Sequence, residues 1–321
     1  MKLGLVSDSL AHLSFEEMLD HAARLGLDGV EVNMGGWSGA PHVDRALLLS
    51  DNGARDRFLR DFASRGLQIL ALNAIGNPLH PDDRSQADCL VDTIRLAGAL
   101  GIETVVTTSG LPAGNSTDTC PNWTTNSWTS ANRKILRYQW EDVLFPFWTG
   151  IAALARESGV RQIAITLGAN QCVHNVPTLL QLREEIGPQI GANLDTAQQM
   201  LMGADPVRSV GALRDSLYHV HAKDVLLNQP VLDVTSLIDT GSLLDIDERA
   251  WSFVTPGYGH NFNWWARFCY QLAAASFEGN ICIEHGDLVM PPLQAVKKAS
   301  SLLRSVMPNS EAHGSQQILR D

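Results

Sequence analysis

Short apolar runs alternate with segments of helical hydrophobic period along almost the whole chain. This alternation is typical of strand–helix units built around a parallel sheet. The predicted strands cover residues 3–7, 29–33, 68–72, 104–108, 162–167, 190–194, 218–222 and 280–283. The predicted helices cover residues 14–25, 55–64, 86–100, 140–158, 176–185, 205–213, 264–275 and 293–306. Eight strands, each followed by a helix, predict an α/β protein with a single (β/α)8 TIM barrel over residues 1–306.

The borders of the predicted helices carry residues that favour helix ends. Ser14 precedes Phe15-Glu16-Glu17 in a capping-box pattern, and Gly26 follows the last turn of the same helix. A doubly wound sheet is the alternative α/β architecture, and it usually has a glycine-rich turn after the first strand. Here that turn reads Ser7-Asp8-Ser9-Leu10 and contains no glycine. We therefore prefer the barrel, with residues 307–321 as a flexible tail rich in Ser, Gln and Gly.

Composition and charge exclude several classes of protein. The chain has 321 residues, of which 45% are hydrophobic and 18% charged, so disorder and coiled coil are excluded. The 35 acidic residues outnumber the 24 basic ones, which gives a net charge of −11. We therefore expect no nucleic-acid partner and no binding to anionic membranes. No apolar run reaches the ~18 residues that a transmembrane helix needs.

The cysteines and the N-terminus favour a cytoplasmic protein. The chain has five cysteines, an odd number, and none of them form a C-x-x-C pair. The first apolar run is too short for a signal peptide. We expect a reduced, cytoplasmic protein that acts alone, as a homo-oligomer or as a subunit of a complex.

Two long connections interrupt the regular rhythm, over roughly residues 110–132 and 224–261. They follow the fourth and seventh predicted strands, and the βα loops of a barrel build its active-site face. The first connection contains Trp123, and the second contains Arg249 and His260. A loop tryptophan either stacks on a sugar face or fastens the loop to the barrel. We take Trp123 and Arg249 as candidates for substrate contact.

Polar side chains stand at the ends of three consecutive predicted strands. Asp195 follows the sixth strand, His221 ends the seventh with Lys223 just behind it, and Glu284 follows the eighth. In a TIM barrel these positions face the pocket, where an unpartnered polar group is costly to bury. Two carboxylates and one imidazole are ligands that suit Mn²⁺, Mg²⁺ or Co²⁺. The alternative is a set of structural groups that satisfy one another.

Earlier strands and the loops behind them add candidates for substrate binding. The second strand contributes Glu31 and Asn33, and Asn73 follows the third. Trp37 and His42 lie in a glycine-rich stretch that lacks the spacing of a nucleotide-binding loop. His80 stands between two prolines and is therefore rigidly placed, which suits either a substrate contact or a structural turn.

The sequence resembles the sugar phosphate isomerase/epimerase family of xylose-isomerase-like TIM barrels, which includes inosose dehydratases, inosose isomerases and ketose 3-epimerases. The resemblance covers roughly residues 1–306. It depends on these stretches: Gly35-Gly36-Trp37-Ser38, Leu72-Asn73-Ala74, Tyr218-His219-Val220-His221-Ala222-Lys223-Asp224, Gly257-Tyr258-Gly259-His260 and Ile283-Glu284-His285.

The resemblance implies a divalent metal held by Glu, Asp, His and Glu from strands five to eight. It also implies that the two glutamates move the proton next to a carbonyl group. Asp195, His221 and Glu284 match three of the four ligands. Relatives read Glu-Leu-His-Pro-Gly after strand five, whereas this chain reads Thr166-Leu167-Gly168-Ala169-Asn170. Where relatives have Asp-Pro-Ser-His, this chain has Asp195-Thr196-Ala197-Gln198.

These departures change the chemistry that we expect. Because Thr166 replaces a glutamate, a divalent metal should bind more weakly, with water or Gln198 completing its coordination sphere. A threonine hydroxyl cannot act as a second general base near neutral pH. Thr166 and Gln198 instead join the candidates for substrate contact. Gly286 stands where an acidic residue is common in relatives, and Ser252 and Val254 stand where arginine is common.

Three functions fit these residues. The first is an isomerase, epimerase or lyase that removes a proton next to the carbonyl of a keto-sugar, cyclitol or related polyhydroxy substrate. Glu284 would be the base, the metal or Lys223 would stabilise the enediolate, and His260 would be an acid. The second is a silent paralogue that binds a sugar-like ligand or belongs to a complex. The third is a metal-free enzyme of another reaction type. A nuclease is rejected because of the net charge and the small ligand set.

Overall fold

Eight parallel strands close into a barrel in the computed structural model, which describes residues 1–238 and 240–308. Their order around the barrel is β1-β10-β7-β6-β5-β4-β3-β2. The barrel strands are β1 (Lys2–Val6), β2 (Gly29–Asn33), β3 (Gln68–Ala74), β4 (Thr104–Thr107), β5 (Gln162–Thr166), β6 (Ile190–Asp195), β7 (Leu217–Ala222) and β10 (Asn280–Ile283). The predicted TIM barrel is confirmed, and each predicted strand lies within two residues of an observed one.

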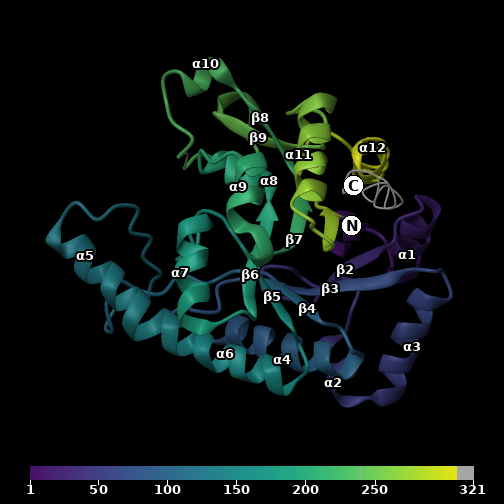
Figure 1. Ribbon diagram of the computed structural model, residues 1–321, viewed down its shortest axis with the longest axis horizontal. Helices are drawn as coiled ribbons and strands as arrows, with labels where there is room; N and C mark the ends of the chain where they lie inside the picture. The colour runs from purple at the N-terminus through teal and green to yellow at the C-terminus, as the bar shows by residue number, and fades with distance from the viewer. Residues whose placement is uncertain (239, 309–321) are drawn as a thin grey trace, which may run out of the picture.

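Helices surround the barrel, and both ends of the described chain lie near α12 (Figure 1). The other helices are α1 (Phe15–Arg24), α2 (Arg45–Ser50), α3 (Asn52–Ala63), α4 (Ser85–Leu100), α5 (Ser130–Arg137), α6 (Phe145–Glu157), α7 (Val176–Ile186), α8 (Thr196–Leu201), α9 (Pro206–Leu213), α10 (Gln229–Leu232) and α11 (Phe262–Ala274), with α12 at Pro292–Val306. Short 3₁₀ turns cover Ser7–Leu10, Arg214–Ser216 and Ile246–Glu248. Large apolar side chains such as Trp148 and Trp265 are fully buried in the main core.

The predicted helix ends are formed as the sequence indicates. Ser14 Oγ accepts a hydrogen bond from the Glu17 backbone N–H, and the Glu17 carboxylate accepts one from the Ser14 backbone N–H, which completes the capping box of α1. Gly26 follows this helix with a φ of +64°, and Gly101 ends α4 with a φ of +70°. A side chain would be strained in this left-handed region, so glycine suits both positions.

The two long connections contain more regular structure than the hydrophobic pattern predicts. The second one holds an antiparallel hairpin of β8 (Asp224–Leu227) and β9 (Trp251–Val254), which forms the upper lobe in Figure 1. The first one ends in α5, which continues through a π-helical stretch, Tyr138–Leu144, into α6. The predicted start of this helix at residue 140 is therefore wrong. No side chain of α5 is fully buried, and its only large apolar residues are Ile135 and Leu136, so its apolar face is too short to predict a helix on its own.

Three further observations bear on the sequence predictions. All five cysteines are free thiols. Within the described residues, no helix has both the length and the hydropathy of a membrane span. The predicted tail lies outside the described residues from position 309 onward.

Candidate active site

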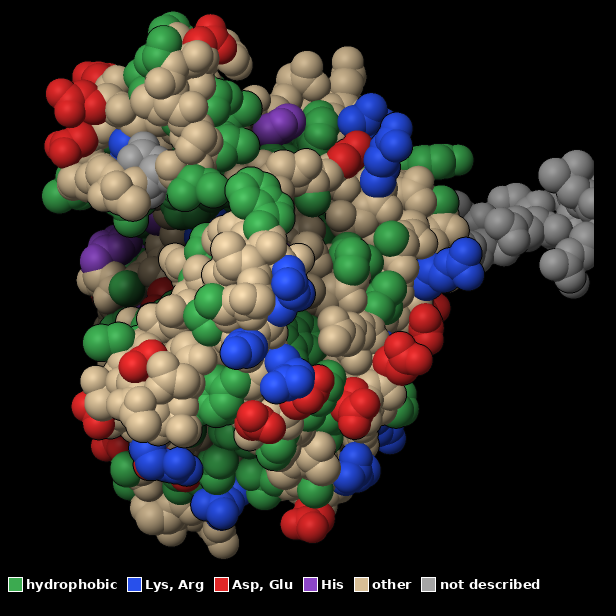
Figure 2. All heavy atoms as spheres, turned by 90° about the vertical axis from the view of Figure 1, so that its left-hand side faces the viewer, with side chains coloured by type: hydrophobic (Ala, Val, Ile, Leu, Met, Phe, Trp, Pro, Cys, Tyr) green, Lys and Arg blue, Asp and Glu red, His purple; other side chains and the backbone are tan. Residues whose placement is uncertain are grey.

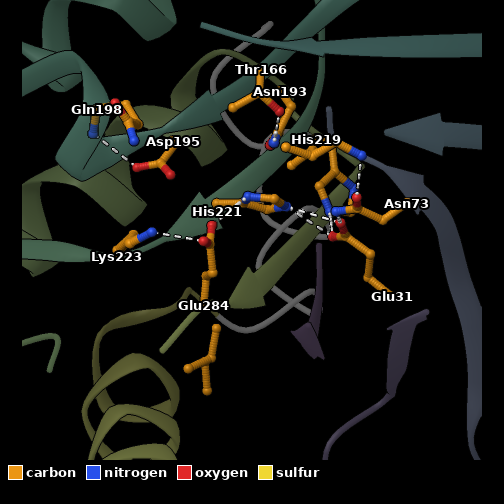
Figure 3. Close-up of polar contacts among 12 residues, drawn as sticks. Glu31, Asn73, Thr166, Asn193, Asp195, Gln198, His219, His221, Lys223 and Glu284 are labelled. Carbon is orange, nitrogen blue, oxygen red and sulfur yellow. Dashed lines mark hydrogen bonds and ion pairs between the residues drawn. The ribbon is translucent and has the colours of Figure 1, made fainter. Parts of the chain in front are cut away.

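The ends of β6, β7 and β10 bring three ligand-type side chains together at the mouth of the barrel (Figure 3). Asp195 pairs with His221 in the β6–β7 register, and Cys282 pairs with His221 in the β10–β7 register, so Glu284 follows two residues later. One ligand atom from each of Asp195, His221 and Glu284 lies within 4.8 Å of the other two. The structure therefore groups the three residues that the sequence indicates as metal ligands.

Glu284 is the most accessible member of this group. Its side chain is 25% exposed, whereas the Asp195 and His221 residues are buried. Lys223 Nζ donates a 2.7 Å hydrogen bond to Glu284 Oε1. Burial alone would raise the pKa of Glu284, but the Lys223 ammonium and the His221 imidazole outweigh it and hold the pKa well below its usual range. Glu284 is therefore a carboxylate at neutral pH.

Lys223 is also buried, and its charge is balanced by the same carboxylates. Burial disfavours the ammonium, yet Glu284 and Asp195 together raise the pKa of Lys223 above its usual value. The ammonium lies 4.3 Å from the centre of the Phe253 ring on β9. Lys223 thus remains a cation beside the base.

His221 connects the mouth of the barrel to a buried polar network. Its Nε2 lies 2.9 Å from Glu31 Oε2, and His219 Nε2 lies 2.7 Å from the same oxygen. Asn73 donates to Glu31 Oε1. Burial opposes the imidazolium, but Glu31 and Glu284 raise the pKa of His221 to about 10. Burial opposes the Glu31 anion in the same way, but His221 and His219 keep its pKa low.

The sequence indicates Glu31 as a polar residue of the second strand and His219 as part of a family stretch, but it assigns a role to neither. Glu31 is a single acidic residue inside the otherwise uncharged strand Gly29–Asn33. His219 lies two residues before His221, so both imidazoles point to the same side of β7. A charged residue at an inward position of a buried strand is the signal that could have identified this network.

Asp195 has few partners of its own. Its Oδ1 accepts a 2.9 Å hydrogen bond from the Gln198 backbone and caps α8. Burial raises the pKa of Asp195 to about 6, with Glu284 adding to the rise and Lys223 and His221 opposing it. Thr166, at the end of β5, accepts a 2.9 Å hydrogen bond from Asn193 Nδ2. Thr166 is thus a neutral residue at the position where the family resemblance implies a glutamate as the fourth ligand.

The donor set suits a divalent metal, which the family resemblance implies. Asp195 and Glu284 offer carboxylate oxygens. His221 Nδ1 lies 2.8 Å from Glu284 Oε2, but the orientation makes no hydrogen bond, so this buried nitrogen is without a hydrogen-bond partner in the described structure. Glu31 holds the opposite ring nitrogen, which is the usual arrangement for a metal-binding histidine. These three residues fit a metal site, and Thr166 leaves it one carboxylate short.

His260, which the sequence indicates as an acid, forms its side-chain ion pair with Asp224. Its Nδ1 lies 2.7 Å from Asp224 Oδ1, and its backbone donates to Asp224 Oδ2. Asp224 begins β8, and its Oδ2 also accepts from the backbone of Gly257 and Gly259. The described contacts therefore tie His260 to the base of the hairpin and not to Glu284.

The predicted substrate-contact residues occupy varied surroundings. Trp37 is 60% exposed, and Trp123 packs edge-on to His174 with 6.4 Å between ring centres. His80 accepts hydrogen bonds from the backbone of Asp82 and Asp83, as a structural turn residue does. The remaining ones are Asn73 beside Glu31, Gln198 after Asp195, Thr166 beside Asn193, and the buried Arg249 on the segment before β9.

Two unsatisfied groups lie near the mouth, after β1 and β2. Both ring nitrogens of His42 are buried without a hydrogen-bond partner in the described structure, and so is Asp8 Oδ1. Burial raises the pKa of Asp8, with Ser38 and His42 opposing the rise and Glu284 adding to it. Orphaned polar atoms of this kind suit contact with the hydroxyl groups of a ligand. Sequence reasoning selected His42 and passed over Asp8.

Comparison with known proteins agrees with this geometry. Residues 19–306 match the family of xylose isomerase-like TIM barrels. An uncharacterized protein from Bacillus subtilis (strain 168) is 39% identical over 311 residues, which cover 96% of this chain and 99% of that protein.

Solved structures share the fold at low sequence identity. A probable 3-DHS dehydratase from Bacillus anthracis has a TM-score of 0.67 at 16% identity, covering 95% of this chain and 99% of its own. The IolI protein with a bound zinc atom has a TM-score of 0.66 at 16% identity, and the match covers 96% of this chain and 100% of the IolI chain. The 3-keto-D-glucoside 4-epimerase of E. coli has a TM-score of 0.64 at 15% identity, covering 95% and 99%. The barrel, its strand-end residues and the family match together show that the chain belongs to the xylose isomerase-like TIM barrels.

Proposed function

We propose that the chain is a sugar-modifying enzyme that removes a proton next to the carbonyl group of a keto-sugar, cyclitol or related polyhydroxy compound. The observation that carries this proposal is the 2.7 Å pair of Glu284 and Lys223, a part-exposed carboxylate beside a buried ammonium. Proton abstraction of this kind needs one base and one group that stabilises the developing oxyanion. The epimerase and the dehydratase of similar fold support a reaction of this class.

Glu284 acts as the base. The C–H bond breaks, its proton goes to Glu284, and its electron pair forms the C=C bond of an enediolate as the carbonyl oxygen becomes anionic. Lys223 moves its hydrogen bond from Glu284 to this oxyanion. Because Lys223 holds the pKa of Glu284 low in the free protein, its movement makes Glu284 a stronger base at the moment of transfer.

The proton returns from Glu284 to the face of the enediolate from which it came. Thr166 offers no second base, so inversion through two carboxylates at the ends of β5 and β10 is not available. A transfer between neighbouring carbons on one face, or loss of a leaving group, fits a single base better than epimerisation does. We therefore propose an isomerase or a lyase before an epimerase.

A divalent cation bound by Asp195, His221 and Glu284 would supply further polarisation of the carbonyl group. The steps described above depend on the chain's own residues. His42 and Asp8 would bind substrate hydroxyls once side-chain movement exposes their unpartnered polar atoms, which are buried in the free protein.

Solvent deuterium exchange tests the proposal. A panel of ketoses and inososes is incubated with the protein in D₂O, and deuterium next to the carbonyl is measured by NMR. We expect exchange with the native protein and a loss of about 10²- to 10⁴-fold for Glu284→Gln. Glu278→Gln is the matched control, because Glu278 is exposed just before β10 at the opposite end of the barrel. Saturable binding without exchange would instead indicate a binding protein.

A further inference from the structure

A chamber of about 600 Å³ lies beside the Glu284–Lys223 pair, between the β8–β9 hairpin and the loop that follows β10. Figure 2 shows hydrophobic side chains in the gap beneath the lobe that carries the hairpin. The apolar residues that line the chamber include Leu226, Trp251, Phe253, Val254, Leu288 and Val289. A free sugar requires a polar surface, which this lining does not provide. The chamber therefore suits an apolar ligand group.

Phe253 and Gly286 join the chamber to the catalytic pair. Both line the chamber, and the Phe253 ring centre lies 4.3 Å from Lys223 Nζ. A Cβ atom at Gly286 would come within 3.1 Å of Lys223 Cε and 3.3 Å of Phe253 Cβ. A larger residue would therefore fill the junction, which glycine leaves free.

Two aromatic rings connect Lys223 to a second buried cation. The ring centres of Phe253 and Trp251 lie 5.1 Å apart, and the Arg249 guanidinium carbon lies 4.3 Å from the centre of the Trp251 ring. Positions 249, 251 and 253 alternate along the chain into β9, so their side chains share one side. The chamber thus has an aromatic wall with a cation at each end.

Arg249 has no acidic partner in the described part of the chain. It is only 3% exposed, and its guanidinium donates to the backbone oxygens of Gly241 and Trp251 at 2.7 and 3.4 Å. Asp247 also lines the chamber but is exposed and forms no ion pair with Arg249. A buried guanidinium without a carboxylate is costly, and a ligand carboxylate would match its planar set of donors.

We propose that the chamber binds an apolar or aromatic arm of the substrate that ends in a carboxylate. The carbonyl end would lie at Glu284 and Lys223, the arm along Phe253 and Trp251, and the carboxylate at Arg249. This inference rests on the proposed function for the carbonyl end and narrows its substrate to an amphipathic anion. Ser252 and Val254 also line the chamber, and neither adds a charge to the wall between Lys223 and Arg249.

Calorimetric titration with benzoate and with its neutral analogue benzamide tests the chamber. We expect benzoate to bind saturably to the native protein, and benzamide to bind about 10- to 100-fold more weakly because it lacks the charge. Arg249→Gln should lower the affinity for benzoate by a similar factor and leave the affinity for benzamide unchanged. Arg208→Gln, at an exposed arginine on α9, should change neither.

Glu284→Gln separates this proposal from the proposed function. The variant should lose deuterium exchange and still bind benzoate. If the native protein binds benzoate but catalyses no deuterium exchange on any carbonyl compound tested, the proposed function is overturned and the chamber proposal stands. Equal binding of benzoate and benzamide to the native protein would overturn the chamber proposal even if Arg249→Gln failed to fold. A homodimer that closes the chamber to benzoate would also overturn it.

Discussion

At the scale of single residues, Glu31 determines which ring nitrogen of His221 faces the mouth of the barrel. It accepts hydrogen bonds from both histidines of β7 and from Asn73 inside the barrel. Since Nε2 of His221 is held by Glu31, Nδ1 is the nitrogen that faces Glu284. Glu31 is therefore a positioning residue that fixes which nitrogen of the ring is available at the mouth.

Replacing Glu31 by Gln should destabilise the fold. The change leaves two buried imidazoles without their anion, and breaking a buried pair in this way costs about 3–5 kcal/mol. Urea unfolding measures the loss, and Glu278→Gln should change the free energy of unfolding by less than about 0.5 kcal/mol. Equal stability of the two variants would show that the network does not hold the barrel together.

The same network predicts how stability depends on pH in the presence of a chelator. His221 has its pKa raised from 6.5 to about 10, so its contribution is complete below pH 6.5 and is lost as pH rises toward 10. The lowered pKa of Glu31 gives the opposite dependence. Its contribution to the free energy of unfolding is present above pH 4.5, the usual pKa of a glutamate, and is lost in acid. We expect the free energy of unfolding to fall between pH 7 and 10, with a smaller slope in Glu31→Gln. Equal slopes of unfolding free energy against pH in the native protein and in Glu31→Gln would show that Glu31 does not raise the pKa of His221.

At the scale of elements, the hairpin after β7 depends on one buried carboxylate. Asp224 accepts from the backbones of Gly257, Gly259 and His260, and its other oxygen lies against the His260 ring. These contacts fasten the segment after β9 to the start of β8. Gly259 is required there, because a Cβ atom would collide with the Val225 carbonyl oxygen.

Asp224→Asn should therefore loosen the lobe more than the barrel. An amide cannot accept all of these hydrogen bonds, and we expect a loss of about 3 kcal/mol in unfolding free energy. Hydrogen exchange should quicken in Asp224–Leu227 and Trp251–Val254 while the β1–β7 strands stay protected. Asp247→Asn, at an exposed residue of the same lobe, should leave both quantities unchanged. Uniform acceleration across the barrel would contradict this account.

At the scale of the whole molecule, the alternation of apolar runs and helical segments predicted the barrel, because burial against helices on the outside imposes that pattern on every strand. The strand-end residues Asp195, His221 and Glu284 could be predicted for the same reason. Glu31 stands out as a charged residue inside a buried strand, but its contacts could not be predicted, since nothing in a strand pattern tells which inward positions contact one another across the barrel. The hairpin was also missed, because its strands are short and one lies far along a loop.

The replacement at Thr166 predicts a weakened metal site. Thr166→Glu should restore a fourth ligand and raise the affinity for Mn²⁺ about tenfold, or about 1.4 kcal/mol. Calorimetry on chelator-treated protein measures this affinity, and Thr149→Glu, at an exposed position of α6, is the control. Unchanged affinity would show that position 166 does not face the metal ligands.

The proposed proton abstraction depends most on Glu284 and Lys223 acting as one unit on a substrate carbonyl. The direct measurement is the rate of deuterium exchange in Glu284→Gln, Lys223→Gln and the double variant, all on the same substrate. Residues that act together give non-additive losses, so we predict about 10²- to 10⁴-fold for each single change and no further loss for the double variant. Losses that multiply in the double variant, or native exchange rates in either single variant, would show that Glu284 and Lys223 do not act as one unit.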